Sequence, residues 1–328
     1  MRYLVTGGGG FVGSHLVLAL REAGHDVVVL DNFSTGHRDA IPAGVTVHDV
    51  DLIDYAATKA VVASQQWDGV LHFAALSLVG ASIADPFYYL RQNYLTALNL
   101  VQACAEHGVK KFVFSSTAAL FGGEERTDPI SESAVIDPGS PYGESKFMIE
   151  RILTWADRLC GMKSACLRYF NAAGADPLGR AGEDHRPETH LIPLTIDVAL
   201  KRRGSLKLFG TDYPTCDGSC VRDYIHVTDL ADAHIRALDQ IDTQSVVYNL
   251  GNGQGYSNLE VIRSVERVTG LTVAWEPAAR RLGDPAVLVA DSTAVRAQTG
   301  WSPKWSALDT IVETAFRWRE QHPNGYHS

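Results

Sequence analysis

The stretch Thr6-Gly7-Gly8-Gly9-Gly10-Phe11-Val12-Gly13 follows a short apolar run and opens a segment of helix length. It satisfies G-x-G-x-x-G and also the wider G-x-x-G-x-x-G. Glycines permit a tight turn and let the backbone approach a pyrophosphate, whose charge then lies at the helix N-terminus. Asp31 stands 18 residues beyond Gly13, where a carboxylate accepts hydrogen bonds from ribose hydroxyls and repels a 2′-phosphate. The stretch therefore predicts a dinucleotide site that takes NAD over NADP; the alternative is a purely structural turn.

Short β-branched runs alternate with helix-length segments through the first half of the chain. We predict buried parallel strands at residues 3–5, 26–30, 45–47, 69–73, 111–115 and 164–167. The intervening helices are predicted at 11–23, 54–64, 86–107 and 142–159. Gly24 and Gly108 follow the first and third of these helices, where a left-handed C-cap residue is wanted. The alternation is typical of an α/β fold with a doubly wound, Rossmann-like parallel sheet.

The composition of the sequence changes after Phe170. Residues 171–189 are rich in Gly, Pro, Asp and His and predict a long loop, which in a compact domain is usually functional. Further helices are expected near 192–202, 228–238, 258–269 and 308–321, with strands at 206–209 and 246–250. We expect an NAD-binding domain at 1–170, to which segments near 226–250 return, and a smaller mixed α/β substrate domain over 171–328.

Composition excludes several classes of protein. The chain has 328 residues, 45% hydrophobic and 20% charged, so it is neither disordered, coiled coil nor collagen-like. A net charge of −9 without a basic stripe argues against a nucleic-acid partner. No apolar run reaches the ~18–20 residues of a membrane span. Five cysteines, an odd and sparse number, predict reduced thiols and a cytoplasmic location.

Tyr142 and Lys146 form a Tyr-x-x-x-Lys pattern within a predicted helix. Positions i and i+4 share one helix face, so an ammonium can lie beside a phenol. The same pattern occurs by chance at Tyr55 and Lys59, which we interpret as a surface pair on a flanking helix. Tyr142, in contrast, follows the strand that ends at Thr117, and ligands of open α/β sheets bind at such strand ends. Thr117 therefore offers its hydroxyl to the same substrate atom.

Longer motifs run through the whole chain. They are Asp51-Leu52, His72-Phe73-Ala74-Ala75, Ser115-Ser116-Thr117, Arg168-Tyr169-Phe170-Asn171, Phe209-Gly210-Thr211-Asp212-Tyr213-Pro214, Val221-Arg222-Asp223-Tyr224-Ile225-His226-Val227, Asn249-Leu250-Gly251 and Arg281-Leu282-Gly283-Asp284. With the glycine loop and Tyr142…Lys146, they resemble the extended short-chain dehydrogenase/reductase superfamily and, within it, the UDP-glucose (UDP-galactose) 4-epimerases. The run from Arg186 to Pro193 resembles bacterial members that supply galactose for surface polysaccharides.

The resemblance implies a reaction and roles for three residues. Tyr142 would take the proton of the sugar 4-hydroxyl while hydride passes from C4 to NAD, and the 4-keto sugar would rotate and take the hydride back on its other face. Lys146 would hold the nicotinamide ribose and depress the pKa of Tyr142, and Thr117 would orient the 4-oxygen. Two alternatives remain. A 4,6-dehydratase would carry Asp-Glu where Ala118-Ala119 follows Thr117, and a non-catalytic NAD-sensing protein would lack the tyrosine or the lysine.

The resemblance also implies two sets of binding residues. The NAD set is Gly7, Gly10, Phe11, Val12, Gly13, Asp31, Asn32, Asp51, Leu52, Phe73, Ala74, Ala75, Asn93, Ser115, Tyr142, Lys146 and Phe170. The UDP-hexose set is Thr117, Tyr142, Asn171, His190, Leu191, Lys207, Phe209, Arg222, Arg281, Asp284 and Leu288. Three departures from the resembling epimerases stand out: Ser77 replaces a lysine, His190 an asparagine, and Leu120-Phe121-Gly122 a Val-Tyr-Gly.

Leu288 stands at the position that closes the sugar pocket in the resembling epimerases. There a tyrosine restricts the enzyme to UDP-glucose and UDP-galactose, whereas a small residue admits N-acetylated sugars. Leucine is intermediate, so we expect UDP-glucose and UDP-galactose as the main pair. The alternative is an ordinary core leucine of a strand over residues 287–290 that faces away from the pocket.

Histidines, cysteines and apolar helix faces complete the predictions. We interpret His72 and His226 as hydrogen-bonded structural residues. Cys216 and Cys220 with His185 and His190 could suggest a metal site, but without C-x-x-C pairs we predict none. The third and fourth helices carry more apolar residues than one sheet face needs: Phe87, Tyr88, Leu90, Tyr94, Leu98, Phe147, Met148, Ile152 and Trp155. The resemblance implies that they form a homodimer through a four-helix bundle.

Overall fold

A parallel sheet forms the centre of the computed structural model, which describes residues 1–122, 128–281 and 284–327. Within these residues the sheet has seven strands: β1 (Arg2–Thr6), β2 (Asp26–Asp31), β3 (Thr46–Asp49), β4 (Gly69–His72), β5 (Lys111–Thr117), β6 (Lys163–Tyr169) and β10 (Val246–Leu250). Their order is β10-β6-β5-β4-β1-β2-β3, and every neighbouring pair is parallel. The doubly wound α/β prediction is confirmed.

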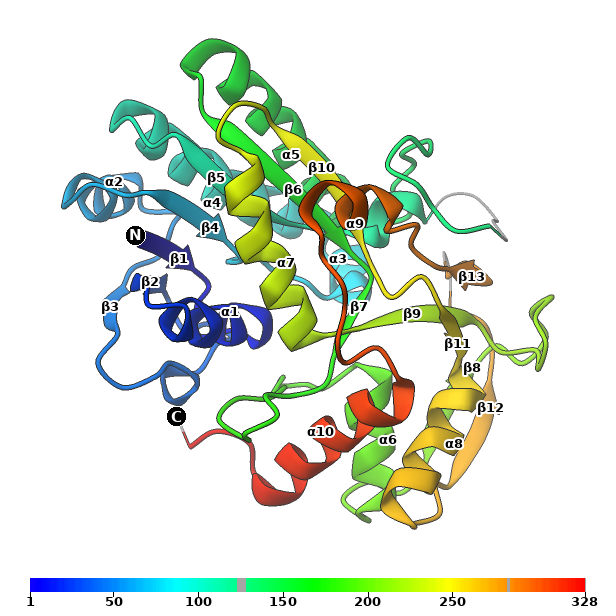
Figure 1. Cartoon of the computed structure of the whole chain (residues 1–328). Helices are drawn as coiled ribbons and strands as arrows, with labels where there is room; N and C mark the ends of the chain where they lie inside the picture. Colours follow the sequence, from blue (N-terminus) through cyan, green and yellow to red (C-terminus); the bar gives the residue numbers. More distant parts are fainter. Residues whose placement is uncertain (123–127, 282–283, 328) are drawn as a thin grey trace.

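Helices cover both faces of this sheet (Figure 1). One face carries α1 (Phe11–Glu22) and α7 (Val227–Gln240), and the other carries α2 (Tyr55–Ala63), α4 (Pro86–Glu106) and α5 (Pro141–Cys160). The two layers bury separate apolar cores, the first around Leu16 and Leu230, the second around Leu100 and Leu153. The strands are apolar on both sides because both faces are covered. The short helices α3 (Val79–Ala84) and α9 (Thr293–Thr299) lie beside α4 and α7, respectively.

A smaller mixed layer lies beyond the carboxyl ends of the strands. It contains β7 (Asn171–Ala173), β9 (Val221–His226), β11 (Gly255–Ser257) and β13 (Val287–Leu288) in one sheet, and β8 (Leu206–Phe209) with β12 (Trp275–Ala278) in another. The helices α6 (Leu191–Ala199), α8 (Asn258–Thr269) and α10 (Leu308–Gln321) enclose a third core around Ile196, Val261 and Ile311. Ser257 and Glu260 form a capping box that begins α8.

The structure departs from the sequence predictions mainly in short elements. The predictions lack α3, α9, β7, β11 and β12, which have three to seven residues each and are too short for a periodic signal. The prediction that β3 is a buried strand is wrong. Because β3 is the last strand of the sheet, Thr46 and Asp49 are exposed.

Gly24 and Gly108 were predicted to end helices in a left-handed conformation. Gly24 and Gly108 have φ of +80° and +73°, which confirms them as left-handed residues at helix ends. In the part of the chain that the structure describes, no helix combines the length and apolarity that a membrane crossing requires.

Candidate active site

The predicted site residues gather where the order of the sheet reverses. The chain adds β2 and β3 on one side of β1 and then continues on the other side with β4, β5 and β6. Such a switch point opens a crevice at the carboxyl ends of the strands. Gly7 follows β1, Asp31 ends β2, Phe73 follows β4 and Thr117 ends β5. The fold therefore brings these four predicted residues to one edge of the sheet.

The glycine loop is too closely packed for side chains. A Cβ on Gly13 would lie 2.1 Å from the carbonyl oxygen of Gly7, and one on Gly7 would lie 2.5 Å from the backbone nitrogen of Ala74. Gly7 also has φ of +73°, a conformation that L side chains rarely adopt. Helix α1 begins after Gly10 without a side-chain cap and without an acidic residue in its first turn. The first N–H groups of α1 can therefore bind an anion, because no carboxylate of the helix's own first turn competes for them.

Asp31 is held against this loop. Its Oδ2 accepts a hydrogen bond from the backbone N–H of Gly9 at 2.8 Å, and its Oδ1 accepts one from Phe33 at 2.8 Å. Burial raises the pKa of Asp31, while these backbone hydrogen bonds lower it. A carboxylate in this position fits the ribose role predicted from the sequence.

The segment after Asn32 also contacts the glycine loop, and it was not predicted from the sequence as part of the site. The backbone N–H of His37 donates to the carbonyl of Gly9 at 2.8 Å, and a Cβ on Gly36 would lie 2.8 Å from the carbonyl carbon of Gly9. A hollow of about 270 Å³ follows this segment, lined by Phe33, Ser34, Thr35, Gly36, His37, Arg38 and Arg186. The Gly36 position is the signal that could have indicated close backbone approach.

Tyr142, Lys146 and Thr117 form a compact group, as the spacing predicted. Helix α5 begins at Pro141, with Ser140 as N-cap accepting a hydrogen bond from the N–H of Gly143 at 3.2 Å. The Lys146 Nζ lies 5.9 Å from the centre of the Tyr142 ring and donates to the carbonyl of Ser115 at 2.9 Å. The Thr117 hydroxyl lies close enough to the Tyr142 phenol to lower its pKa. A phenol, an ammonium and a hydroxyl thus meet at the end of β5.

Burial controls the pKa values of this pair. It raises the pKa of Tyr142 to about 12, and the nearby Thr117 hydroxyl lowers it. It also lowers the pKa of Lys146 to about 7. The expected depression of the Tyr142 pKa by Lys146 is not seen here: burial is the largest effect on the phenol, and the role of Lys146 stays a prediction.

A buried network of hydrogen bonds, which was not predicted from the sequence, joins α5 to β5 and β6. Arg168 on β6 makes two hydrogen bonds to Glu150 on α5, at 2.9 and 2.6 Å, and the Ser116 hydroxyl donates to Glu150 at 2.6 Å. A Cβ on Gly143 would lie 2.4 Å from the carbonyl oxygen of Ala119, so α5 approaches the end of β5 closely. An arginine directly after a predicted buried strand was the available signal, since an arginine is rarely buried unless paired.

A comparison with family models places the chain. The NAD dependent epimerase/dehydratase family matches residues 3–251. The chain belongs to this family. The match confirms the resemblance drawn from the motifs, and the packed glycine loop, the free helix N-terminus and Asp31 fit the dinucleotide that gives the family its name.

Relatives and solved structures of the family cover almost the whole chain. A UDP-glucose 4-epimerase of Halalkalibacterium halodurans is 49% identical over 99% of this chain and 98% of its own length. A crystal structure of a UDP-glucose 4-epimerase is 45% identical, with a TM-score of 0.96 over all of both chains. A crystal structure of UDP-glucose 4-epimerase from Bifidobacterium longum in complex with NAD+ and UDP is 36% identical, with a TM-score of 0.94 over 99% of this chain and 100% of that chain.

Three residues expected to line NAD in this family are engaged elsewhere. The Asn93 amide accepts from the N–H of Leu76 at 2.8 Å and donates to Ser145 at 3.0 Å, which ties the turn after β4 to α5. Leu52 is 3% exposed within the second core, and Phe170 is 8% exposed in a small cluster with other apolar residues. These side chains position the crevice walls, and their contact with NAD stays a prediction.

Most residues predicted to hold UDP lie in the smaller layer, on β8, β9 and β13 and in the segment between β12 and β13. Arg222 on β9 pairs with Asp284 and donates to the carbonyl of Pro285 at 2.8 Å. The Arg281 guanidinium stacks over the ring of Phe209 at 4.2 Å. Lys207 lies two residues before Phe209 on β8, and Leu288 faces Arg222 in the register of β13. Leu282 and Gly283 of the same motif lie outside the described residues.

Three further predicted substrate contacts lie at the ends of elements. Asn171 begins β7, and Leu191 begins α6. His190 is the N-cap of α6, and its Nδ1 lies 2.6 Å from Oε1 of Glu183. The His190 ring is therefore turned toward a carboxylate of its own loop, and its contact with a sugar stays a prediction.

The structural interpretation of His72 and His226 is confirmed. The His72 Nδ1 lies 2.7 Å from the Thr6 hydroxyl, and the His226 Nε2 lies 3.0 Å from the Thr314 hydroxyl. Burial lowers the pKa of each to about 3, so both rings are neutral near pH 7. Neither ring can act as a charged catalyst at that pH.

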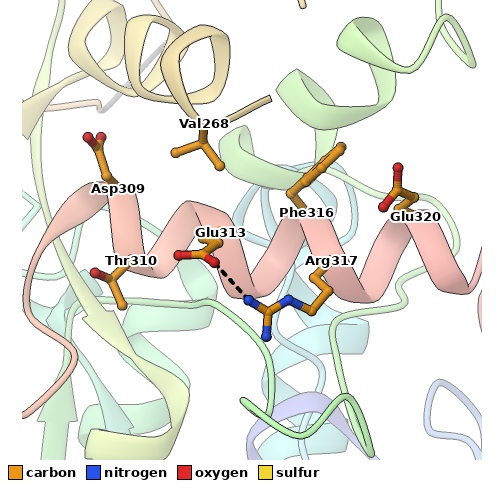
Figure 2. A pocket seen from close by; sticks show the side chains of 7 residues that line it. All are labelled: Val268, Asp309, Thr310, Glu313, Phe316, Arg317 and Glu320. Atoms are coloured by element: carbon orange, nitrogen blue, oxygen red, sulfur yellow. Dashed lines mark hydrogen bonds and ion pairs between the residues drawn. The ribbon is translucent and has the colours of Figure 1, made fainter. Parts of the chain in front are cut away.

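A second hollow lies away from the crevice. It measures about 400 Å³ between α8 and α10 and is lined by Val268, Asp309, Thr310, Glu313, Phe316, Arg317 and Glu320 (Figure 2). Arg317 pairs with Glu313 at 2.7 Å, with both side chains about half exposed. None of the residues that line this hollow belongs to the predicted site, and it has no glycine loop or helix N-terminus to bind a phosphate.

Proposed function

We propose that the chain is an NAD-dependent UDP-glucose 4-epimerase, which interconverts UDP-glucose and UDP-galactose by reversible hydride transfer at C4 of the sugar. The observation that carries this function is the proximity of Tyr142, Lys146 and Thr117 to one another, at the same edge of the sheet as the glycine loop. Relatives 45–49% identical over nearly the whole chain bear the same activity in their names. Residues 1–170 would hold the dinucleotide, and 171–328 most of the UDP-sugar.

The chain's own residues supply the proton transfers. When bound, NAD supplies a hydride acceptor and donor at C4. Tyr142 accepts the proton of the 4-hydroxyl and returns it to the 4-oxygen after the sugar has turned its other face. Thr117 lies beside the phenol, and the protonated form of Lys146 places a positive charge near it. Since Tyr142 accepts the proton as a phenolate and becomes a phenolate again when it returns the proton, one group serves both directions.

An epimerase fits the residues after Thr117 better than a dehydratase does. Ala118 and Ala119 begin the 3-10 helix η2 (Ala118–Phe121), and Ala118 is buried. Elimination of water requires an acid/base at this place, and alanine supplies none. A purely NAD-sensing role is disfavoured because both Tyr142 and Lys146 are present and assembled.

Arginines would hold the diphosphate of the substrate. Arg222 and Arg281 lie on adjacent parts of the smaller layer, and their planar guanidinium groups can each donate two hydrogen bonds to phosphate oxygens. In this structure Arg222 is satisfied by Asp284 and Pro285. We expect UDP to compete with these partners and to extend from β9 toward Asn171 and Leu191.

An exposed apolar face supports the expected homodimer. Phe87 on α4 is 80% exposed and Trp155 on α5 is 53% exposed, although α4 and α5 pack along their length against each other. A two-fold axis beside these helices would bury both faces in a four-helix bundle. We place this dimer in the cytoplasm, in keeping with free thiols at all five cysteines.

The function is tested with the purified protein and without added NAD. The protein is incubated separately with UDP-galactose, UDP-N-acetylglucosamine and UDP-glucuronate, and the products are identified by chromatography. We expect UDP-glucose from UDP-galactose, together with NAD that remains bound through purification, because release of reduced cofactor would strand the 4-keto sugar. A protein without bound NAD whose activity scales with added NAD would contradict retention, and Ser77 would then be the first residue to examine. No conversion of any UDP-hexose, with or without NAD, would contradict the function.

Leu288 is expected to set the preference between sugars. The Leu288 side chain is half-buried and packs against the apolar cluster that contains Ala118, Phe121 and Phe170. Ala118 directly follows Thr117 in the sequence. Overpacking of a tight site costs about 1–3 kcal/mol, so a 2-acetamido group should slow turnover by about one to two orders of magnitude. Leu288→Ser should narrow this difference and Leu288→Tyr should widen it, as measured by kcat/KM on both sugar pairs.

Val287 provides the matched control for this prediction. Adjacent residues of a strand point to opposite faces, and Val287 packs with Tyr213 and Ala286 instead. Val287→Ser should therefore leave the ratio of the two kcat/KM values unchanged. Equal rates on both pairs in the unmodified protein, or an unchanged ratio in Leu288→Ser, would show that Leu288 is an ordinary core residue.

A further inference from the structure

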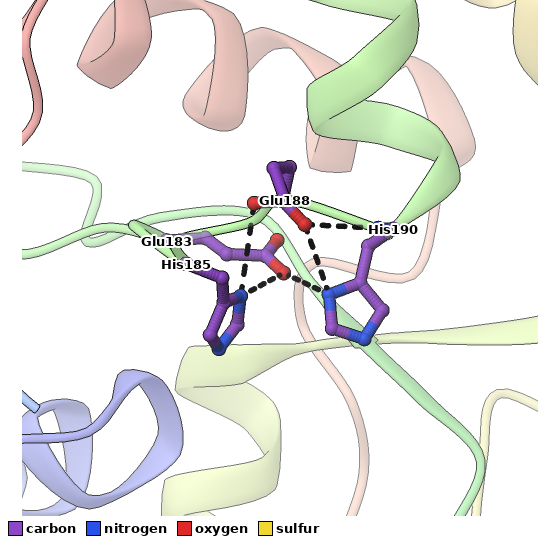
Figure 3. A group of neighbouring side chains, drawn as sticks. All are labelled: Glu183, His185, Glu188 and His190. Atoms are coloured by element: carbon purple, nitrogen blue, oxygen red, sulfur yellow. Dashed lines mark hydrogen bonds and ion pairs between the residues drawn. The ribbon is translucent and has the colours of Figure 1, made fainter. Parts of the chain in front are cut away.

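Four side chains of the loop between β7 and α6 converge on one point (Figure 3). They are Glu183, His185, Glu188 and His190, and one ligand atom from each lies within 4.8 Å of all the others. The Nδ1 of His185 lies 3.2 Å from Glu183 Oε1 and 3.6 Å from Glu188 Oε2. The Nδ1 of His190 lies 2.6 Å from Glu183 Oε1 and 3.3 Å from Glu188 Oε1. Both imidazoles thus present the same nitrogen to the same two carboxylates.

These close contacts are not aligned as hydrogen bonds. Oε1 of Glu183, Nδ1 of His185 and Oε2 of Glu188 are buried, and none of them has a hydrogen-bond partner. Glu183 is only 5% exposed. A buried polar atom without a hydrogen-bond partner costs about 1–3 kcal/mol, and a bound ion is one of the ordinary ways in which such an atom is satisfied. Three such atoms that face one another indicate lone pairs directed at a shared centre.

The distances between the two histidines and the two carboxylates are compatible with tetrahedral coordination, with His185 facing Oε2 of Glu188 and His190 facing its Oε1. With metal–ligand bonds of about 2.0–2.2 Å, neighbouring ligand atoms lie about 3.3–3.6 Å apart. Three of the four distances, 3.2, 3.3 and 3.6 Å, fall within about 0.1 Å of this range. The short one involves His190, whose side chain is 46% exposed and can move outward.

We propose that Glu183, His185, Glu188 and His190 bind one divalent transition-metal ion, with Zn²⁺ the best match. Two imidazole nitrogens and two carboxylate oxygens are zinc ligands, and nitrogen donors disfavour Mg²⁺ and Ca²⁺. Two carboxylates also neutralise one divalent cation without a further counter-ion. The prediction of no metal weighed the histidines together with cysteines, but Cys216 is exposed and Cys220 accepts a hydrogen bond from Asn258 at 3.1 Å.

The surroundings support a structural ion. The backbone N–H groups of Thr189 and His190 donate to Glu188 Oε1 at 2.7 and 2.9 Å and so orient that carboxylate, as partners of metal ligands commonly do. The His185 ring packs edge-on against Phe11, the first residue of α1, at 6.3 Å between centres. The ion would therefore anchor the loop between the glycine loop and α6. None of the four ligands carries a proton or hydride step, but His190 also belongs to the predicted UDP-hexose set, so the ion would fix this residue at the edge of the substrate site.

The test uses the full chain without an affinity tag. Protein dialysed against a chelator is titrated with ZnCl₂ by calorimetry, and binding is measured again with Co²⁺, whose visible spectrum reports tetrahedral coordination. We expect one equivalent of Zn²⁺ to bind with a Kd below about 1 µM, a tetrahedral Co²⁺ spectrum without a thiolate band, and a higher unfolding temperature with Zn²⁺. MgCl₂ should give none of these signals.

Variants separate this site from non-specific binding. Glu188→Gln should weaken Zn²⁺ binding by at least about 100-fold, because it removes a ligand and half of the negative charge. His185→Ala gives the same information if Glu188→Gln fails to fold. Cys216→Ser, which removes an exposed thiol outside the loop, should change nothing. A Kd above about 1 µM in the unmodified protein, or unchanged binding in both ligand variants, would show that the four residues form an ion-pair cluster only.

Discussion

Tyr142→Phe is expected to lower turnover by at least about 100-fold, the usual contribution of a positioned acid/base. The substitution removes one oxygen and leaves the ring in place beside Lys146. Because we propose that the smaller layer holds the UDP part of the substrate, the affinity for substrate should change little, and the loss should appear in kcat. Steady-state kinetics with UDP-galactose, together with a binding isotherm for UDP, measure the two quantities separately.

Tyr55→Phe is the matched control, because Tyr55 and Lys59 repeat the Tyr-x-x-x-Lys spacing. Tyr55 is half-buried on α2, and Lys59 pairs with Glu106 at 2.7 Å. The interpretation of Tyr55 as a surface residue is thus only partly right. Because Tyr55 lies on α2 and not at the end of β5 with Thr117, Tyr55→Phe should leave turnover unchanged. Similar losses in Tyr55→Phe and Tyr142→Phe would contradict the assignment of the site.

Glu150→Ala is expected to lower the free energy of unfolding by about 3–5 kcal/mol. The side chains of Arg168 and Glu150 are 5% and 7% exposed, so the variant leaves a guanidinium buried without its counter-charge. Ser116 loses its acceptor as well. Urea unfolding at 25 °C measures the change. Turnover should fall too, since Lys146 lies one helical turn before Glu150 on α5.

Two comparisons isolate the cause of this loss. Glu313→Ala breaks a pair whose side chains are 47% and 55% exposed, and it should cost less than about 1 kcal/mol. Replacing Glu150 and Arg168 together by leucines should recover part of the stability, because no charge then stays buried. A Glu150→Ala variant no less stable than Glu313→Ala would show that Arg168 finds another partner or water.

Local patterns made most of the fold and the reactive pair predictable. Tyr142 and Lys146 lie on one helix face because of their spacing alone, and the helix boundaries at Asn258–Thr269 and Leu308–Gln321 agree with the periodicity. The predicted strand at 246–250 is β10, which joins β6 at the edge of the large sheet. Short elements without an apolar run gave no signal, so α3, α9, β7, β11 and β12 were missed, whereas an equally short apolar strand such as β4 was predicted.

Contacts between distant segments were beyond local patterns. Glu150 and Arg168 belong to different predicted elements, and nothing in their spacing shows that β6 and α5 bring them together. The loop over residues 171–189 was predicted as functional, but its alternation of acidic residues and histidines predicted no geometry. Only the folded loop turns Glu183, His185, Glu188 and His190 toward one centre.

The sequence by itself determined the nucleotide loop, the alternation of strands and helices, and the residues that can exchange a proton. These depend on the spacing of neighbours along the chain, which the backbone geometry of helix and strand converts directly into shared faces. The tertiary structure alone decided the order of the strands, the pairing of Arg222 with Asp284 and the burial of Tyr142 and Lys146. Burial is set by segments far apart in sequence, and loss of hydration then shifts both pKa values. The reactive groups can therefore be read from the chain, but their protonation is a property of the fold.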